Sequence, residues 1–338
     1  MANVTVVGAG AWGTALAIQA ARSGHAVTMW ALEPDVVDDI EKRNENSVYL
    51  PKTKLPATIR ATTDAKRAVA DAELVILVPP SKHLRSVSSS LADALPKKAV
   101  IAVASKGIEE SSLKMMSEVL EETLPSVGDE RRVFVGGPSF AREVADGLPT
   151  DIVVASKDES AAVRVQSLLH APNFRIYTSV DPAGIEIGGA LKNVMAIATG
   201  ACDGLRFGAN ARSAIITRGL AEMARLGVAV GADPLTFLGL AGMGDLVLTC
   251  TGDLSRNRTL GLKVAEGMNP HDYLKAQRSV AEGYFTCHAA HDLGQKLGVD
   301  MPITDQVYSV LHAGRPLRDA IVILMTRASR DELRGIRV

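Results

Sequence analysis

The chain has 338 residues, which is enough for about two domains. Hydrophobic residues make up 47% and aromatic residues only 4%, an aliphatic, alanine-rich composition that suits packed helices. The formal net charge is −1 without a run of like charge, so we expect no nucleic-acid partner. No apolar stretch reaches about 18 residues and no basic leader precedes one, so we expect no membrane insertion. Cys202, Cys250 and Cys287 are scattered and odd in number, which favours a reducing compartment and buried, unpaired thiols.

The amino-terminal segment predicts a strand, a glycine turn and a helix. The β-branched run Val4–Val7 leads into G-x-G-x-x-G, and the helix-forming run 14–21 follows. In a dinucleotide site, Gly8 makes the tight turn, Gly10 lets the backbone approach a pyrophosphate, and Gly13 allows close packing of helix on strand. The phosphates then lie at the positive end of the helix dipole.

An acidic residue follows at the expected distance. Glu33 lies 20 residues after Gly13, at the end of a second predicted strand over 26–32. A carboxylate there accepts hydrogen bonds from a ribose 2′-hydroxyl. The alternative is a turn with spare glycines, which this context disfavours.

The first half of the chain continues to alternate strands and helices. Continuous apolar strands are typical of a parallel sheet that is covered on both faces, so we predict an open, doubly wound α/β domain of the Rossmann type. The further elements expected are a helix over 35–43, a strand near Ile59, a helix near Lys66, and strands at 73–78, 99–104, 132–135, 152–155 and 175–178.

The pattern becomes helical from residue 183 to about residue 330. Gly227, Gly298, Pro302 and Pro316 limit the predicted helices. These helices are expected at 217–226, 234–240, 280–297, 304–312 and 317–329. We therefore predict a dinucleotide-binding domain over 1–181 and an all-α substrate domain over 182–338.

Polar residues follow three predicted strands, where open α/β sheets bind ligands. They occur in Val78-Pro79-Pro80-Ser81, in Ala104-Ser105-Lys106-Gly107 and in Gly136-Gly137-Pro138-Ser139-Phe140. A lysine after a strand is commonly just solvated. Lys106 nevertheless lies at the ligand-binding edge with Gly107 beside it, so a functional role is equally expected.

Lys192 stands in an otherwise apolar helical segment next to small residues. Gly188 and Gly189 lie one helical turn before it, and each costs about 1 kcal/mol relative to alanine. That cost is understandable if another group must approach the helix closely. Burial lowers a lysine pKa and suits it to proton transfer. The alternative is a lysine that reaches solvent from a helix edge.

A further polar cluster follows in the second half. Asp245 comes after a glycine turn and could simply cap a helix. Ser255, Arg256 and Asn257 together could receive a phosphate, because a guanidinium offers a forked pair of donors. A solvated polar loop is the alternative. The seven histidines and three cysteines lack metal-ligand spacing, so no metal is expected.

Several long motifs resemble the bacterial NAD(P)-dependent glycerol-3-phosphate dehydrogenases. They are GAGAWGTALA, SKG, GPSFAREVADGLPT, GGALKNVMAIATGACDGLRFGANARSAIITRGLAEM, GMGDLVLTCTGDLSRNR and VAEGY, in the family's order and at roughly its spacing. The resemblance covers about residues 3 to 330. It implies a Rossmann domain followed by a helical domain similar to the carboxy-terminal domain of 6-phosphogluconate dehydrogenase.

The resemblance also implies an activity and a set of site residues. The reaction is reversible hydride transfer between nicotinamide and dihydroxyacetone phosphate or sn-glycerol 3-phosphate. Lys192 is then the proton donor and acceptor, with Lys106 and Asp245 beside it as catalytic residues. The substrate-binding residues are Lys106, Gly137, Ser139, Lys192, Asp245, Ser255, Arg256 and Asn257. The cofactor-binding residues are Gly8, Gly10, Ala11, Trp12, Gly13, Leu32, Glu33, Tyr49, Lys106, Ala141, Arg256, Val280 and Glu282.

Two departures from the family pattern bear on the cofactor. Ala11 stands where members often have serine, and Leu32 and Glu33 stand where many members have basic residues. We therefore expect NAD and NADP both to be accepted, with NADH favoured. The family's role implies a cytoplasmic enzyme that makes glycerol phosphate for phospholipid synthesis, and a homodimer is compatible with it, although the sequence does not determine the oligomeric state.

Two other functions are compatible with parts of the pattern. A related β-hydroxyacid dehydrogenase would share both domains and the lysine, but Ser255-Arg256-Asn257 argues against a carboxylate substrate. A non-catalytic nucleotide-binding protein would need none of Lys106, Lys192 and Asp245, and their joint presence argues against it.

Overall fold

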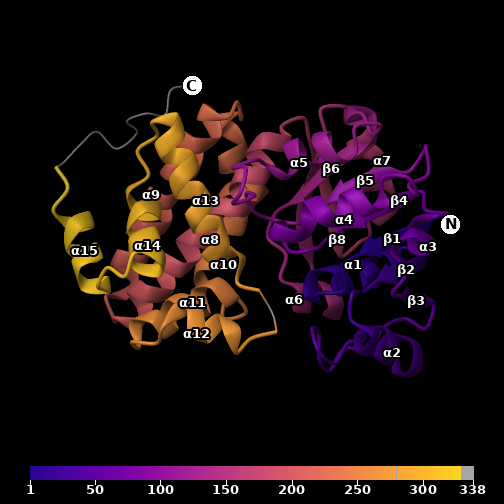
Figure 1. Ribbon diagram of the computed structural model, residues 1–338, viewed down its shortest axis with the longest axis horizontal. Coiled ribbons are helices and arrows are strands. Elements are labelled where there is room, and N and C mark those ends of the chain that lie inside the picture. Colours follow the sequence, from indigo (N-terminus) through magenta and orange to yellow (C-terminus); the bar gives the residue numbers. More distant parts are fainter. Residues whose placement is uncertain (279, 329–338) are drawn as a thin grey trace. The chain divides into compact units, whose positions relative to one another are not determined.

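The structure is a computed structural model, and it describes residues 1–278 and 280–328 (Figure 1). The chain forms two compact units. One comprises Met1–Ser105 and Met116–Pro182, and the other comprises Lys106–Met115 and the chain from Ala183 onward. The domain boundary after residue 181 stays a prediction. The short segment 106–115 packs with the second unit although it belongs to the first by sequence.

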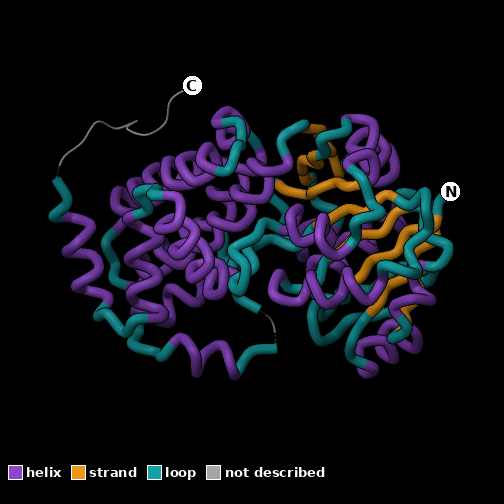
Figure 2. The backbone as a smooth tube through the Cα atoms, turned by 45° about the horizontal axis from the view of Figure 1, so that its top comes forward, coloured by secondary structure: helices purple, strands orange, loops and turns teal. Residues whose placement is uncertain are grey.

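The first unit is built on one eight-stranded sheet in the order β3-β2-β1-β4-β5-β6-β7-β8. In the described part of the chain, Figure 2 shows every strand in this unit and only helices and loops in the other. The strands are β1 (Asn3–Val7), β2 (Ala26–Trp30), β3 (Ile59–Thr62), β4 (Leu74–Leu77), β5 (Val100–Val103), β6 (Arg132–Gly136), β7 (Thr150–Ala155) and β8 (Phe174–Ser179). Each expected strand is present.

The expectation of a parallel sheet holds at every pairing of neighbouring strands except one. β6 and β7 run antiparallel, whereas all the other neighbouring strands are parallel. Between them the chain forms only α6 (Ala141–Asp146), a helix of six residues. Such a helix rises about 9 Å, less than the length of a five-residue strand, about 17 Å. The chain therefore re-enters the sheet near the end where β6 finished.

Successive side chains of the apolar strands point to opposite faces of the sheet, so each strand contributes to two hydrophobic cores. Leu74 and Ile76 of β4 join the core on one face of the sheet, and Val75 and Leu77 join the core on the other. The first face is covered by α1 (Ala11–Arg22), α2 (Pro34–Arg43), α6 and α7 (Glu159–Leu169). The second is covered by α3 (Ala65–Val69), α4 (Leu84–Leu91) and α5 (Met116–Thr123). The doubly wound α/β prediction is confirmed.

The second unit is helical and is organised around α8 (Pro182–Gly204). Ile187, Leu191, Val194 and Met195 of α8 are fully buried, so this helix is surrounded by others. The other helices of this unit are α9 (Gly208–Ala229), α10 (Asp245–Thr251), α11 (Arg256–Ala265), α12 (Pro270–Lys275), α13 (Glu282–Leu297), α14 (Pro302–His312) and α15 (Leu317–Met325).

Several helices differ from their predicted limits. The helix expected at 217–226 is the second half of the longer α9. The helix expected at 234–240 is a 3₁₀ turn, Pro234–Leu238, followed by a π-helical turn, Leu240–Gly244. The predicted end of the last helix, Ser329, lies outside the described residues. Within the described chain, no helix is long and apolar enough to span a membrane. Cys202, Cys250 and Cys287 are free and buried, as expected.

The segment 106–115 joins the helical unit through its apolar side chains. Ile108 and Met115 face each other in an antiparallel bridge and are both buried in the helical core. The same segment also places the Lys106 side chain against Gly189 of α8. This segment therefore brings Lys106 to the lysine-bearing helix.

Candidate active site

Two lysines share one buried carboxylate in the helical unit. Lys192, from the middle of α8, donates a hydrogen bond to Oδ1 of Asp245. Lys106 donates to the other oxygen, Oδ2, at 2.8 Å. Asp245 is fully buried and Lys192 is only 7% exposed. The structure thus assembles the three predicted catalytic residues from α8, α10 and the segment 106–115.

The local backbone explains how these side chains meet. A Cβ on Gly188 would lie 2.3 Å from the carbonyl oxygen of Ala241, so only glycine lets α8 approach the π-helical turn there. That turn ends at Gly244, and Asp245 begins α10 directly after it. π-helical turns occur frequently at functional sites. The expectation that something approaches α8 closely at its glycines is confirmed.

The reading of Asp245 as a plain helix cap is wrong. Gly244, not Asp245, holds the cap position of α10, and both carboxylate oxygens of Asp245 are engaged by lysines. The hydroxyl of Thr249 also donates to the backbone carbonyl of Asp245, at 2.6 Å, and fixes the first turn of α10.

Burial and charge set the protonation of this cluster. Burial lowers the pKa of Lys192 from 10.5 to about 7; attraction to Asp245 opposes this shift, and repulsion from Lys106 adds to it. Burial alone would raise the pKa of Asp245, but the ammonium groups of Lys106 and Lys192 hold that pKa below its usual 3.8. Asp245 is therefore ionised at neutral pH, and Lys192 can both give and take a proton there.

Asn257 links three helices rather than lying in a solvated loop. Its Nδ2 donates to Oδ1 of Asn193 at 2.8 Å, and its Oδ1 accepts from the backbone N–H of Gly283 at 2.9 Å. The neighbouring Ser255 caps α11, because its hydroxyl accepts the Arg258 N–H at 3.2 Å. Residues 255–257, for which a solvated loop was the alternative, thus form the start of α11.

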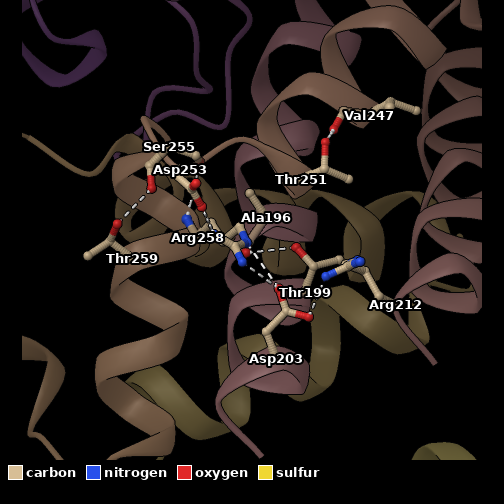
Figure 3. A network of polar contacts seen from close by, with 10 residues as sticks. All are labelled: Ala196, Thr199, Asp203, Arg212, Val247, Thr251, Asp253, Ser255, Arg258 and Thr259. Carbon is tan, nitrogen blue, oxygen red and sulfur yellow. Dashed lines mark hydrogen bonds and ion pairs between the residues drawn. The ribbon is translucent and has the colours of Figure 1, made fainter. Parts of the chain in front are cut away.

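Arg258 is a residue that the sequence reasoning missed, and Figure 3 shows its network. Its guanidinium binds Asp203 of α8 through Nε at 3.0 Å and Nη2 at 2.8 Å. Arg212 of α9 donates to the other oxygen of Asp203 at 3.0 Å. These ion pairs hold α11 against the lysine-bearing helix. Sequence offered no signal beyond an arginine two residues after Arg256.

Arg256 has more exposed surface than its two buried neighbours, but partial burial of its guanidinium lowers its pKa. Its guanidinium attracts the carboxylate of Glu282, the first residue of α13. Val280 lies two residues before that helix and is half-buried. The structure therefore brings together the start of α11 and the start of α13, two segments that the resemblance assigns to the cofactor.

The glycine loop in the first unit has the geometry of a phosphate cradle. Gly8 has a φ of +117°, and a Cβ on Gly13 would lie 1.9 Å from the carbonyl oxygen of Gly8. Gly10 caps α1 and faces open space. Ala11 and Trp12 form the first turn of α1.

Asn46 braces this loop and was also missed. It is fully buried, and its Nδ2 donates to the carbonyl of Ala9 at 2.7 Å and to the hydroxyl of Thr14 at 2.8 Å. Its Oδ1 accepts the backbone N–H of Tyr49 at 3.1 Å. Asn46 therefore couples the loop after α2 to the glycine turn.

Glu33 is held in place at the end of the second strand. The hydroxyl of Tyr49 donates to Oε1 of Glu33 at 2.8 Å. Leu32 beside it is 74% exposed. The nearby Arg43 pairs with Asp39, with 2.6 Å between Nε and Oδ1. This edge of the first unit therefore presents a carboxylate and an apolar side chain.

The segment after β6 also has a defined conformation. Gly137 has a φ of +105°, and the Ser139 hydroxyl donates to its carbonyl at 3.0 Å. Ala141 begins α6. These three predicted residues lie on the first unit, whereas Lys106, Lys192, Asp245 and the 255–257 segment lie on the second. The described residues contain no group of three His, Cys, Asp or Glu side chains placed to hold a metal ion.

Comparison with known proteins accounts for both units. Residues 3–162 match the amino-terminal family of NAD-dependent glycerol-3-phosphate dehydrogenase, and residues 181–322 match its carboxy-terminal family. The chain belongs to the NAD-dependent glycerol-3-phosphate dehydrogenase family. It is therefore an oxidoreductase that uses NAD(P) as its coenzyme.

Individual relatives are similar over nearly their whole length. The chain is 51% identical over 330 residues to the glycerol-3-phosphate dehydrogenase [NAD(P)+] of Geobacter metallireducens, covering 98% of both chains. It is 48% identical over 331 residues to that of Syntrophotalea carbinolica, covering 98% of this chain and 99% of the other. The crystal structure of the Coxiella burnetii glycerol-3-phosphate dehydrogenase superposes with a TM-score of 0.92 at 38% identity, covering 96% of this chain and 99% of that one.

Two adjacent glycines of α8 provide a test of the site's packing. We expect Gly188→Ala to reduce kcat/KM at least about tenfold, because the added Cβ displaces the turn that carries Asp245, and displacements near 1 Å can cost about a hundredfold. Steady-state kinetics measures the loss.

The matched control is Gly189→Ala, whose Cβ would lie 3.4 Å from the flexible Lys106 side chain. Both variants make the same gain in helix propensity, so only the contact differs. We expect Gly189→Ala to keep most of the wild-type kcat/KM. Equal activities for the two variants would show that the approach of Ala241 does not position Asp245.

Proposed function

We propose that this chain reversibly reduces dihydroxyacetone phosphate to sn-glycerol 3-phosphate, with Lys192 as the proton donor and acceptor. The observation that supports this most directly is the buried Lys192, which shares Asp245 with Lys106. Family membership supports the reaction, and the lysine cluster supports the role of the chain's own residues in it.

The residues of the first unit fit a dinucleotide. Gly10 faces open space at the start of α1, where backbone N–H groups can receive a pyrophosphate. Glu33, fixed by Tyr49, can accept hydrogen bonds from the hydroxyls of an adenosine ribose. In our proposal Ala11, Trp12, Leu32, Ala141, Arg256, Val280 and Glu282 complete the cofactor site. When bound, the nicotinamide supplies or accepts the hydride.

Lys192 handles the proton. In the reduction its ammonium group donates a proton to the carbonyl oxygen of the ketone as that oxygen becomes an alcohol. In the oxidation its neutral amine takes the proton back. Asp245 holds the Lys192 side chain in position from within the protein. Lys106 keeps a second positive charge beside the reacting oxygen, which favours the negative charge that develops there.

Arg256 is the strongest candidate for the substrate phosphate. Ser255 caps α11 and the amide of Asn257 binds Asn193 and Gly283, so Arg256 is the exposed member of the triplet. A guanidinium can bind two phosphate oxygens at once. In this proposal Ser255, Asn257, Gly137 and Ser139 line the rest of the substrate site. Binding of the remote phosphate helps to fix the reacting carbon.

The cofactor preference follows from Glu33. The Tyr49 hydrogen bond holds the Glu33 carboxylate in place after β2, and at the ribose position that we propose for it this carboxylate would repel the 2′-phosphate of NADP. Leu32 offers no compensating charge, and Arg43 is paired with Asp39. We therefore propose that both cofactors are used and that NADH is favoured. We further propose a cytoplasmic role in supplying glycerol phosphate for phospholipid synthesis.

Replacing Lys192 tests the reaction and its proton donor together. We expect wild type to oxidise NADH with dihydroxyacetone phosphate and not with a 2-oxo acid. Lys192→Ala should lower kcat by about 10²–10⁴-fold, the usual contribution of general acid catalysis, while NADH still binds. Stopped-flow fluorescence of NADH measures binding separately.

Lys296→Ala, at an exposed position of α13, is the control and should retain wild-type kcat. Turnover of the Lys192 variant near the wild-type rate would remove Lys192 from the mechanism. Turnover of the 2-oxo acid in preference to the phosphorylated ketone would overturn the substrate.

The pKa of Lys192 predicts opposite pH profiles for the two directions. Reduction needs the protonated lysine, so log kcat/KM should fall as pH rises above about 7. Oxidation needs the neutral amine, so log kcat/KM should fall as pH drops below about 7. Initial rates in both directions across pH 5–10 give these profiles.

The substrate phosphate titrates near pH 6 and could imitate part of this behaviour. Asp245→Asn distinguishes the two groups, because it removes the attraction that raises the pKa of Lys192. The residual activity should then show its inflection at lower pH, whereas a phosphate titration would not move. An unchanged inflection would assign the profile to the substrate.

Glu33→Arg tests the cofactor proposal. A cation at this position should bind the 2′-phosphate, and a charge-assisted hydrogen bond is worth about 1.5–3 kcal/mol, or about ten- to hundredfold in the NADPH/NADH ratio of kcat/KM. Tyr49→Phe is the matched milder change, since it frees Glu33 without altering charge, and it should shift the ratio less. A wild type that already prefers NADPH by about tenfold or more would contradict the placement of Glu33 at the ribose.

A further inference from the structure

A cluster of imidazole and phenol rings lies between α13 and α14, which pack side by side (Figure 1). His291 of α13 stacks on Tyr308 of α14, with ring centroids 4.0 Å apart, and its Nδ1 lies 2.8 Å from Oδ1 of Asp305. The rings of His288 and His312 have centroids 5.3 Å apart, and each centroid lies 5.5 Å from that of Tyr308. Three of the chain's seven histidines therefore gather at one place.

His288 connects this cluster to the segment 106–115. Its Nδ1 lies 3.4 Å from Oε1 of Glu110, and its Nε2 lies 3.5 Å from Oδ2 of Asp292, one turn later in α13. An imidazole carries a hydrogen on both ring nitrogens only when it is protonated. The protonated ring can therefore serve both carboxylates at once, whereas the neutral ring turns a lone pair toward one of them.

The other groups at this place leave the role of cation to His288. The groups that face it are Glu110 from the segment 106–115, Asp292 from α13, and Tyr308 and His312 from α14. Burial lowers the pKa of His312; its contact with the carbonyl of Tyr284 opposes that shift, and repulsion from His288 adds to it. Burial raises the pKa of the Tyr284 phenol, and the Glu110 carboxylate raises it further. His312 and Tyr284 are therefore neutral at neutral pH.

Glu110 lies at the turn of the segment that carries Lys106. Leu113 has a φ of +59° and donates its N–H to the carbonyl of Glu109 at 2.8 Å, which closes the turn around Glu110. Lys106 lies four residues before Glu110, and its Nζ reaches Asp245 at 2.8 Å. Because the segment is short and folds back on itself, a contact at its turn constrains the backbone from which Lys106 extends.

We propose that His288 is a positioning residue, which when protonated clamps Glu110 to α13 and thereby keeps Lys106 against Asp245. The clamp loosens as the imidazole loses its proton, a change that histidine side chains undergo between about pH 5 and 8. The side chains of His288 and Glu110 are 43% and 35% exposed, so the pair has the modest strength of a partly solvated ion pair. The consequence for catalysis rests on the role proposed above for Lys106.

Hydrogen exchange followed by mass spectrometry tests the clamp without an activity assay. At about pH 6, we expect the protected amides of 106–115 to exchange about two- to fivefold faster in His288→Gln and in Glu110→Gln than in wild type. The double variant should match the single variants, because the loss of either partner already breaks the pair. At about pH 8.5, wild type should exchange as fast as His288→Gln.

His288→Lys is the rescue variant, because it keeps a cation opposite Glu110 throughout this pH range. Its segment 106–115 should exchange at the wild-type rate at about pH 6, and more slowly than wild type at about pH 8.5.

Kinetics tests whether the clamp positions Lys106. At about pH 6, we expect His288→Gln to lower kcat/KM for reduction of dihydroxyacetone phosphate by about two- to fivefold, because a displaced Lys106 supports the reacting oxygen less well. At about pH 8.5 the two proteins should be equally active, and His288→Lys should exceed both. Comparing proteins at one pH cancels the titrations of Lys192 and of the substrate phosphate, which they share.

His291→Gln is the matched control. It also removes an imidazole–carboxylate pair of α13, but the partner is Asp305 of α14 rather than the segment 106–115. We expect it to leave the exchange of 106–115, and the pH dependence of kcat/KM, as in wild type.

Three results would overturn the proposal. Equal exchange of 106–115 in wild type and His288→Gln at about pH 6 would show that the pair does not hold the segment. A His288→Lys variant that behaves as His288→Gln does would show that charge is not the cause. Faster exchange with unchanged kcat/KM would show that Lys106 does not depend on the clamp. A wild type that does not reduce dihydroxyacetone phosphate would instead overturn the proposed reaction, and the exchange experiment would still decide the clamp.

Discussion

The carboxylate of Asp245 is the interaction on which the helical unit's chemistry depends. A buried carboxylate and two buried or half-buried lysines are individually costly, and each is tolerated because the others are present. The cluster carries one positive charge when all three groups are ionised, and it becomes neutral when Lys192 loses its proton. Proton transfer thus changes the net charge of the cluster between +1 and 0. In neither state is the Asp245 carboxylate buried without a cation, or a lysine buried without the carboxylate.

That carboxylate in turn constrains the backbone around it. Asp245 reaches α8 because the π-helical turn ends directly before it and because Gly188 leaves room for Ala241. The helix α8 is also held near its carboxyl end by the pairing of Asp203 with Arg258 and Arg212. Asn257 adds a third connection, to Asn193 and Gly283. The lysine-bearing helix is therefore fixed at several points along its length by groups that do not react.

The sequence predicts what depends on local spacing. The strand, glycine turn and helix at residues 3–22 follow from a short motif whose steric requirements lie within the motif itself, and the glycines before Lys192 indicate a close approach to α8. Contacts between distant segments are a different matter. The partners of Asp245 lie 139 and 53 positions away, and no periodicity encodes such a pairing.

The features that the sequence did not predict also depend on contacts between distant segments. Asn46 braces a glycine loop 37 positions earlier, and Arg258 pairs with an aspartate 55 positions earlier. The π-helical turn was predicted only as a glycine turn before Asp245, because its glycines are equally typical of an irregular turn, and the antiparallel β6–β7 pairing was missed because a continuous apolar strand fits either direction. Motif resemblance supplied the roles of Lys106 and Arg256 that these physical patterns left open.

The segment 106–115 has a consequence for how the protein is made. It is synthesised before α8, α10 and α13, yet Ile108 and Met115 are buried only when the helical core exists. During translation this segment therefore stays unpacked while residues 116–182, which complete the sheet unit, are synthesised. Lys106 consequently becomes part of the lysine pair only after most of the chain has emerged. An enzyme cut into separate sheet and helix fragments at residue 182 would leave one of its two lysines on the wrong piece.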